Sequence, residues 1–78
     1  MVKLLRITGY QENVTTQFGP RDHVDGILFE NQFAATQGNE TTKEWLPVGK
    51  ISWSLDVIGK DLYVEYGPKG RISSCLIK

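Results

Sequence analysis

The C-terminal run DLYVEYGPKGRISSCLIK, residues 61–78, constrains the fold of this chain more than any other stretch. Two segments rich in β-formers flank a turn sequence, Gly67-Pro68-Lys69-Gly70. Pro68 suits the second position of a type I turn, and Gly70 can take the left-handed backbone conformation that ends it. The sequence therefore predicts a β-hairpin.

That turn also predicts a register for the hairpin. If Tyr66 faces Ile72, then side chains on the same face of the two strands pair in order along the hairpin. The expected pairs on one face are Val64 with Ser74 and Leu62 with Leu76, and on the other face Glu65 with Ser73 and Tyr63 with Cys75. Since a two-stranded hairpin is only marginally stable alone, the remaining chain must supply more sheet.

Alternating apolar residues and turn residues predict the rest of that sheet. Further strands are expected at residues 2–10, with a bulge at Gly9, at residues 26–37 and at residues 50–57. The strand 50–57 should direct Ile51, Trp53, Leu55 and Val57 inward. Residues 11–24 are predicted to form a polar loop, with a strand at 14–18 as the alternative, and residues 38–43 to form a turn. The expected fold is all-β, a single domain spanning 1–78, and a small five-stranded OB-like barrel; an SH3-like barrel or a small sandwich is the alternative.

Composition excludes several classes of protein. The chain of 78 residues has nine basic and nine acidic residues, so no net charge directs it to nucleic acid or to an anionic membrane. No apolar run approaches the ~20 residues that span a bilayer. A single cysteine, Cys75, excludes an internal disulfide, and a single histidine, His23, disfavours a zinc site. We therefore expect a cytoplasmic protein without metal or cofactor.

Catalytic chemistry has little support in the sequence. His23 lies beside Asp22 and Asp25, but no nucleophile is tied to this group, so a solvated histidine is the better interpretation. Cys75 has no cation adjacent in sequence that would lower its pKa, which favours an inert thiol. The chain is therefore not expected to be an enzyme.

Aromatic and basic residues favour a single-stranded nucleic acid ligand. Proteins of that class combine cations that follow the phosphate backbone with exposed rings on which bases stack. The sequence predicts phosphate contacts and stacking platforms, with Tyr10 sharing a polar strand face with Arg6, and Trp45 lying in a loop. The candidate cations are Arg6, Lys50, Lys69 and Arg71, and the candidate rings are Tyr10, Trp45 and Tyr63. The turn 67–70 would supply one of the ligand-binding loops of an OB-fold.

The run KDLYVEYGPKGRI, read as strand, basic turn and strand, resembles the very small OB-type single-strand binders carried by phages and plasmids. The resemblance covers mainly residues 50–77, and it implies binding of single-stranded DNA or RNA with weak sequence preference. The zero net charge departs from that class and favours an alternative, a protein-protein interaction module or an accessory assembly subunit. An apolar edge at residues 27–36 could pair with such a partner or with a second copy in a homodimer.

Overall fold

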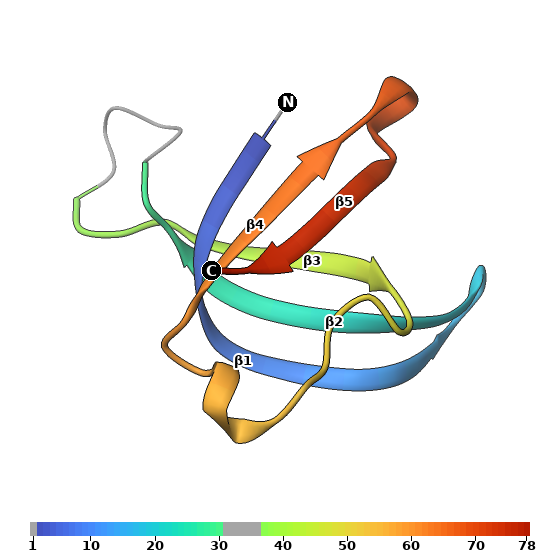
Figure 1. The fold of residues 1–78 in the computed structure, drawn as a ribbon. Coiled ribbons are helices and arrows are strands. Elements are labelled where there is room, and N and C mark those ends of the chain that lie inside the picture. Colours follow the sequence, from blue (N-terminus) through green and yellow to red (C-terminus); the bar gives the residue numbers. More distant parts are fainter. Residues whose placement is uncertain (1, 31–36) are drawn as a thin grey trace.

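Five antiparallel strands form one curled sheet in the order β3-β2-β1-β4-β5 in the computed structural model, which describes residues 2–30 and 37–78 (Figure 1). The predicted all-β class is therefore confirmed. In the described residues no ladder joins the two edge strands, β3 and β5, so the sheet curls around its core without closing into the expected barrel.

The longest strand, β1 (Val2–Thr16), gives the sheet its curl. Its first residues pair with β4 (Asp61–Tyr66), and from Leu5 onward it pairs with β2 (Gly19–Leu28). Register shifts interrupt the second pairing between Ile7 and Gly9 and between Gln11 and Val14. Such bulges bend a strand and increase its twist. The bulge expected at Gly9 is confirmed. The loop predicted at residues 11–24 is wrong, because β1 and β2 run through it, and the alternative strand at 14–18 is confirmed as far as Thr16.

β2 therefore starts earlier than predicted and lies between β1 and β3 (Thr41–Pro47). A Cβ atom on Gly26 would lie 2.7 Å from the Arg6 carbonyl oxygen, so this position in the middle of the sheet requires glycine. The predicted strand 26–37 is confirmed only to Leu28, and residues 31–36 lie outside the described part of the chain. Trp45, expected in a loop, lies in β3.

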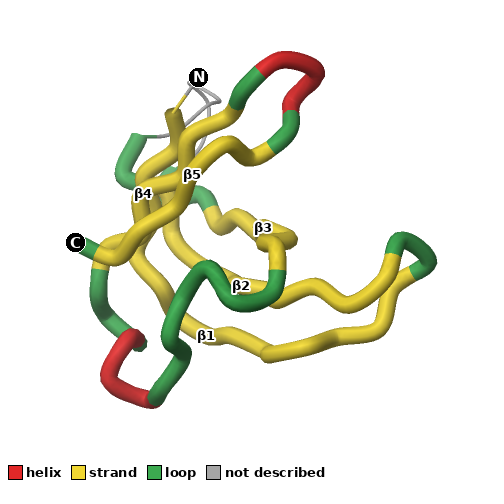
Figure 2. The backbone as a smooth tube through the Cα atoms, turned by 45° about the vertical axis from the view of Figure 1, so that its right-hand side comes forward, coloured by secondary structure: helices red, strands yellow, loops and turns green. Residues whose placement is uncertain are grey.

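The predicted strand at residues 50–57 is absent. Residues 48–60 instead pass along the inner side of the curled sheet from β3 to β4 and include a short 3-10 turn, η1 (Leu55–Val57) (Figure 2). In such a turn, residues two apart no longer share a face. Ile51 and Trp53 pack against the core and Val57 is buried, but Leu55 is 79% exposed, contrary to the prediction.

The C-terminal hairpin of β4 and β5 (Ile72–Ile77) is confirmed, with the turn η2 (Pro68–Gly70) at its tip. Tyr66 faces Ile72 as predicted, but a bulge after this pair shifts the register by one residue. Cys75 therefore faces Val64, Leu76 faces Tyr63 and Ile77 faces Leu62, so the predicted pairs beyond Ile72 are wrong. The shift places Ile77 against the core and leaves Leu76 exposed.

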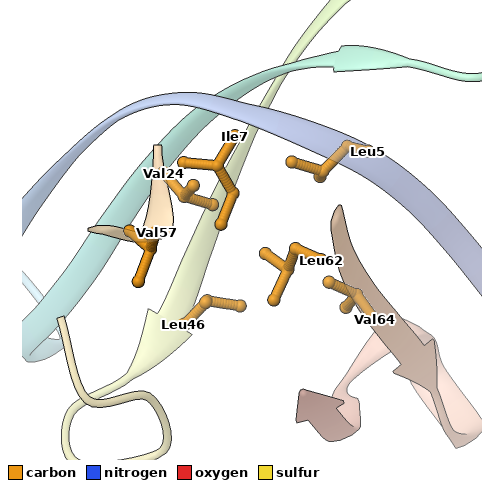
Figure 3. Close-up of a cluster of buried hydrophobic side chains, with 7 residues drawn as sticks. All are labelled: Leu5, Ile7, Val24, Leu46, Val57, Leu62 and Val64. Atoms are coloured by element: carbon orange, nitrogen blue, oxygen red, sulfur yellow. The ribbon is translucent and has the colours of Figure 1, made fainter. Parts of the chain in front are cut away.

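Side chains from four strands and from η1 form the core (Figure 3). Burying each aliphatic side chain contributes about 1.5–3 kcal/mol, which is the main force holding so small a sheet curled. The fully buried apolar residues are Leu5, Ile7, Val24, Leu46, Val57, Leu62 and Val64.

Candidate nucleic-acid interface

The outer face of β2 and β3 presents an aromatic surface near the turn between β1 and β2. Paired residues of neighbouring strands lie on the same face of a sheet. His23 is paired with Gln11 on β1 and with Trp45 on β3, and Arg21 is paired with Val14 and Pro47. The opposite face of β2 carries the buried Val24, which faces the core. His23, Arg21 and Trp45 therefore share the outer surface.

The turn between β1 and β2 places Phe18 beside this surface. The Thr16 hydroxyl donates to the Gly19 carbonyl at 2.6 Å and accepts from the Phe18 N–H at 3.1 Å. Gly19 has a φ of 98°, which only glycine adopts without strain. The side chain of Phe18 is consequently held out in solvent, 75% exposed.

Phe18 and Trp45 border an open, apolar hollow. It has a volume of about 370 Å³ and is lined by Thr16, Gln17, Phe18, Arg21 and Trp45. Trp45, which was predicted as a stacking residue, is 48% exposed there. Phe18 and Arg21 were missed, although an aromatic and a cation flanking the Gly19-Pro20 turn signal could have indicated them. We call the five lining residues the Trp45 hollow.

His23 supports the Trp45 ring. The centroids of the two rings lie 4.4 Å apart at an interplanar angle of 56°, and the His23 side chain is largely covered. His23 Nδ1 lies 3.9 Å from Asp25 Oδ1, and Asp25 lies opposite Lys43 in the ladder between β2 and β3. The Trp45 indole ring thus packs against His23 and stays partly exposed to solvent at the hollow. This arrangement suits stacking of a flat ring from outside.

Tyr10 does not belong to this surface. The bulge between Ile7 and Gly9 reverses the side-chain alternation of β1, so Tyr10 turns to the inner face rather than sharing a face with Arg6 as predicted. Its ring stacks on Trp53 with the centroids 5.0 Å apart and the planes at 18°. Tyr10 therefore packs against the core and the segment that crosses it.

Arg6 and Tyr63 lie together on the outer face of β1 and β4, away from the Trp45 hollow. The Arg6 guanidinium is 3.4 Å from Asp61 Oδ1 and 5.3 Å from the centroid of the Phe29 ring. Lys78 Nζ lies 4.8 Å from the centroid of the Tyr63 ring. Both predicted residues already have partners within the chain.

The remaining predicted cations lie in turns. Lys69 and Arg71 are exposed at the tip of the β4–β5 hairpin, where Lys69 has a left-handed φ of 64°. Both this tip and the β1–β2 turn project from the sheet, well apart from each other (Figures 1 and 2). Lys50 is exposed in the segment after β3. The structure thus brings Trp45 together with none of the predicted cations.

Two titratable groups on the inner side have shifted pKa values. Burial, a hydrogen bond to Glu44 and the charge of Glu44 all raise the pKa of Tyr66 well above its usual range. Burial also raises the pKa of Cys75, a shift that Lys50 reduces and Asp22 increases. These directions describe a neutral phenol and a poorly reactive thiol at neutral pH.

In residues 2–30 and 37–78, no group of three or more His, Cys, Asp or Glu side chains is placed to hold a metal ion. None of the helical turns in these residues is long and apolar enough to cross a membrane. Comparison of the chain with protein-family models, with curated proteins and with solved structures gave no match.

Proposed function

We propose that the protein is a cytosolic, non-catalytic, OB-like domain that binds single-stranded DNA or RNA at the Trp45 hollow with weak sequence preference. The observation that carries this proposal is the exposure of Trp45 and Phe18 on either side of an apolar hollow. OB-folds, which are partly open five-stranded barrels, bind oligonucleotides on strands 2 and 3 and on the loops between strands 1 and 2 and between strands 4 and 5. The hollow occupies the corresponding face and the first of these loops.

In this proposal, bases stack on Trp45 and Phe18 and the phosphate backbone meets Arg21. Each base stacked on an aromatic ring contributes about 1–3 kcal/mol, and every base offers a flat face, which explains the weak sequence preference. Lys69 and Arg71 on the second loop would contact phosphates farther along the strand. Arg6, Lys50 and Tyr63 lie outside the proposed path, and Tyr10 is directed inward.

Fluorescence anisotropy with a labelled single-stranded oligonucleotide tests the proposal. Trp45→Ala should weaken binding by about 5- to 150-fold, because it removes a stacking platform worth about 1–3 kcal/mol. Phe29→Ala is a matched control, since Phe29 is 47% exposed, nearly as much as Trp45, and lies against Arg6 instead. Wild-type protein that does not bind at micromolar concentration would refute the proposal.

Charge reversal of the β4–β5 turn tests the second loop. The double variant Lys69→Glu/Arg71→Glu should lower oligonucleotide affinity if the turn contacts phosphate. Its stability should hardly change, because exposed charges contribute little to folding. Unchanged affinity would confine the interface to the Trp45 hollow.

A protein ligand is the second candidate function, favoured by the small number of cations at the hollow. Among the five lining residues only Arg21 is charged. An apolar side chain of a partner could fill the same hollow, in which case the protein would act as an interaction module or assembly subunit. A partner that binds wild-type protein but not Trp45→Ala, together with no oligonucleotide binding, would favour this function.

A further inference from the structure

The two edge strands of the sheet differ in their protection against pairing with another strand. β3 carries Lys43, Glu44 and Pro47, and charges and prolines are common devices that discourage pairing at an edge. β5 has the sequence ISSCLI, with no charge and no proline between Arg71 and Lys78. In the described residues β5 has β4 as its one hydrogen-bonded neighbour. β5 is thus the edge suited to accept a further strand.

The hydrogen-bond pattern shows which groups β5 directs to its open edge. Lys78 N–H donates to the Asp61 carbonyl at 2.9 Å, which makes Asp61 and Lys78 a hydrogen-bonded pair at the end of the ladder. In an antiparallel ladder, hydrogen-bonded and non-hydrogen-bonded pairs alternate. Ser74 and Leu76 therefore direct their N–H and C=O groups to β4, whereas Cys75 and Ile77 direct theirs to the open edge.

We propose that two copies of the chain form a symmetric dimer by antiparallel pairing of β5 with β5, centred on Cys75. This register uses the outward N–H and C=O groups of Cys75 and keeps each face of the sheet continuous. Cys75 then lies opposite the partner's Cys75 on the inner face. Ser74 lies opposite the partner's Leu76 on the outer face.

The charges and apolar side chains of β5 favour a second copy of the chain as the partner that pairs with this edge. In the register centred on Cys75, Lys78 lies opposite the partner's Ile72, so no two like charges face each other directly. The exposed Leu76 gains cover from the strand added beside it. Pairing along one six-residue strand buries little surface, so we expect a weak dimer with a dissociation constant in the micromolar range.

Sedimentation equilibrium over a range of protein concentrations tests this dimer without any oligonucleotide, so its result is independent of the proposed nucleic acid binding. Wild-type protein should dimerise as concentration rises. Ser74→Lys and Leu76→Glu, each alone, should weaken dimerisation at least tenfold, because each places a charge directly opposite an uncharged side chain of the partner, the partner's Leu76 or the partner's Ser74. The double variant Ser74→Lys/Leu76→Glu should recover it, because the new charges meet in two opposite pairs across the symmetry axis.

Val48→Glu is the matched control, since Val48 is about as exposed as Leu76 but lies after β3. It should leave dimerisation unchanged, and circular dichroism should show all four variants folded. A wild-type monomer at every concentration would overturn the proposal. So would single variants that dimerise like wild type, a double variant that does not recover, or loss of the dimer in Val48→Glu.

Discussion

Asp22 is the one buried charged side chain among the described residues, and both of its oxygens are used. Oδ1 accepts from the Asn13 N–H and Oδ2 accepts from Trp53 Nε1, each at 2.9 Å. Asn13 lies in the second bulge of β1 with a left-handed φ of 53°. The Asp22 carboxylate thus connects the bulge of β1 to the segment that crosses the core. Its two hydrogen bonds offset part of the free-energy cost of burying the charge.

Asp22→Asn should destabilise the fold, because an amide group can accept from only one of these two donors. A buried donor left without a partner costs about 1–3 kcal/mol. Urea denaturation followed by circular dichroism measures the change. Asp25→Asn is the control, since the Asp25 side chain is about half exposed and its substitution should change stability by less than about 0.5 kcal/mol. Equal effects of the two substitutions would contradict this role of Asp22.

Cys75 should react slowly with iodoacetamide in the folded protein. Burial raises the pKa of its thiol from the ordinary value of 9.0, so at pH 8 less thiolate is present than in the unfolded chain. Lys50 opposes this shift, and Lys50→Gln should slow the reaction further. Mass spectrometry of dilute protein, with a urea-unfolded sample for comparison, measures the rates. A folded protein that reacts as fast as the unfolded one would contradict the assignment.

At the scale of elements, a polar cluster connects the strands on either side of the opening in the sheet. Lys3 Nζ on β1 donates to Glu44 Oε2 at 2.8 Å and to the Thr42 hydroxyl at 2.7 Å on β3. Tyr66 on β4 forms a hydrogen bond with Glu44. These contacts bring β1, β3 and β4 together where no ladder joins the edges. They stabilise the curl that places the Trp45 hollow on the outer side.

This cluster should make stability sensitive to alkaline pH. The pKa of Tyr66 is raised above its ordinary value of 10.0, so the unfolded chain loses the phenol proton more readily than the folded protein. The corresponding stability is present below pH 10 and declines as the pH rises above it. Urea denaturation at pH 8 and above pH 10 should show a smaller loss for Tyr66→Phe than for wild type. Cys75→Ser, measured alongside, removes the separate contribution that begins near pH 9.

Elements determined by residues adjacent in sequence were predicted correctly, whereas elements that depend on contacts distant in sequence were not. The β4–β5 hairpin is determined by a turn of adjacent residues, and it was found. Its bulge was not, because the bulge depends on Ile77 reaching the core, which other strands supply. The second bulge of β1 depends on Asp22, nine residues away, so residues 11–24 resembled a loop. Phe18 and Arg21 were missed as site residues because they lie in this segment, although the local Gly19-Pro20 turn signal could have indicated them.

For the whole molecule, composition and alternation predicted an all-β chain. The opening between β3 and β5 and the path of residues 48–60 were not predicted, because both depend on contacts distant in sequence. The apolar alternation of Ile51, Trp53, Leu55 and Val57 is typical of a strand. However, Tyr10 and Asp22 hold Trp53 from outside that segment, and Leu55 is left in solvent. Of the predicted rings, only Trp45 came to lie on the proposed interface. Side-chain facing in a curled sheet depends on bulges as much as on alternation.

Because acidic and basic residues are equal in number, few cations are available to contact phosphate, and oligonucleotide affinity should depend only weakly on salt concentration. The proposed path offers at most four cations: Arg21 at the hollow, Lys69 and Arg71 on the second loop, and the exposed Lys43, which lies two residues before Trp45 on β3. For single strands the slope of log affinity against log salt is about −0.7 per phosphate neutralised, which gives about −2.8, or a loss of about 50-fold between 50 and 200 mM salt. Lys69→Gln/Arg71→Gln should reduce the steepness by about 1.4, whereas Trp45→Ala should lower affinity and leave the slope unchanged. Anisotropy titrations at several salt concentrations measure both quantities. A wild-type slope steeper than about −4 would require cations outside this path, such as Arg6 or Lys50, and would contradict the proposed interface.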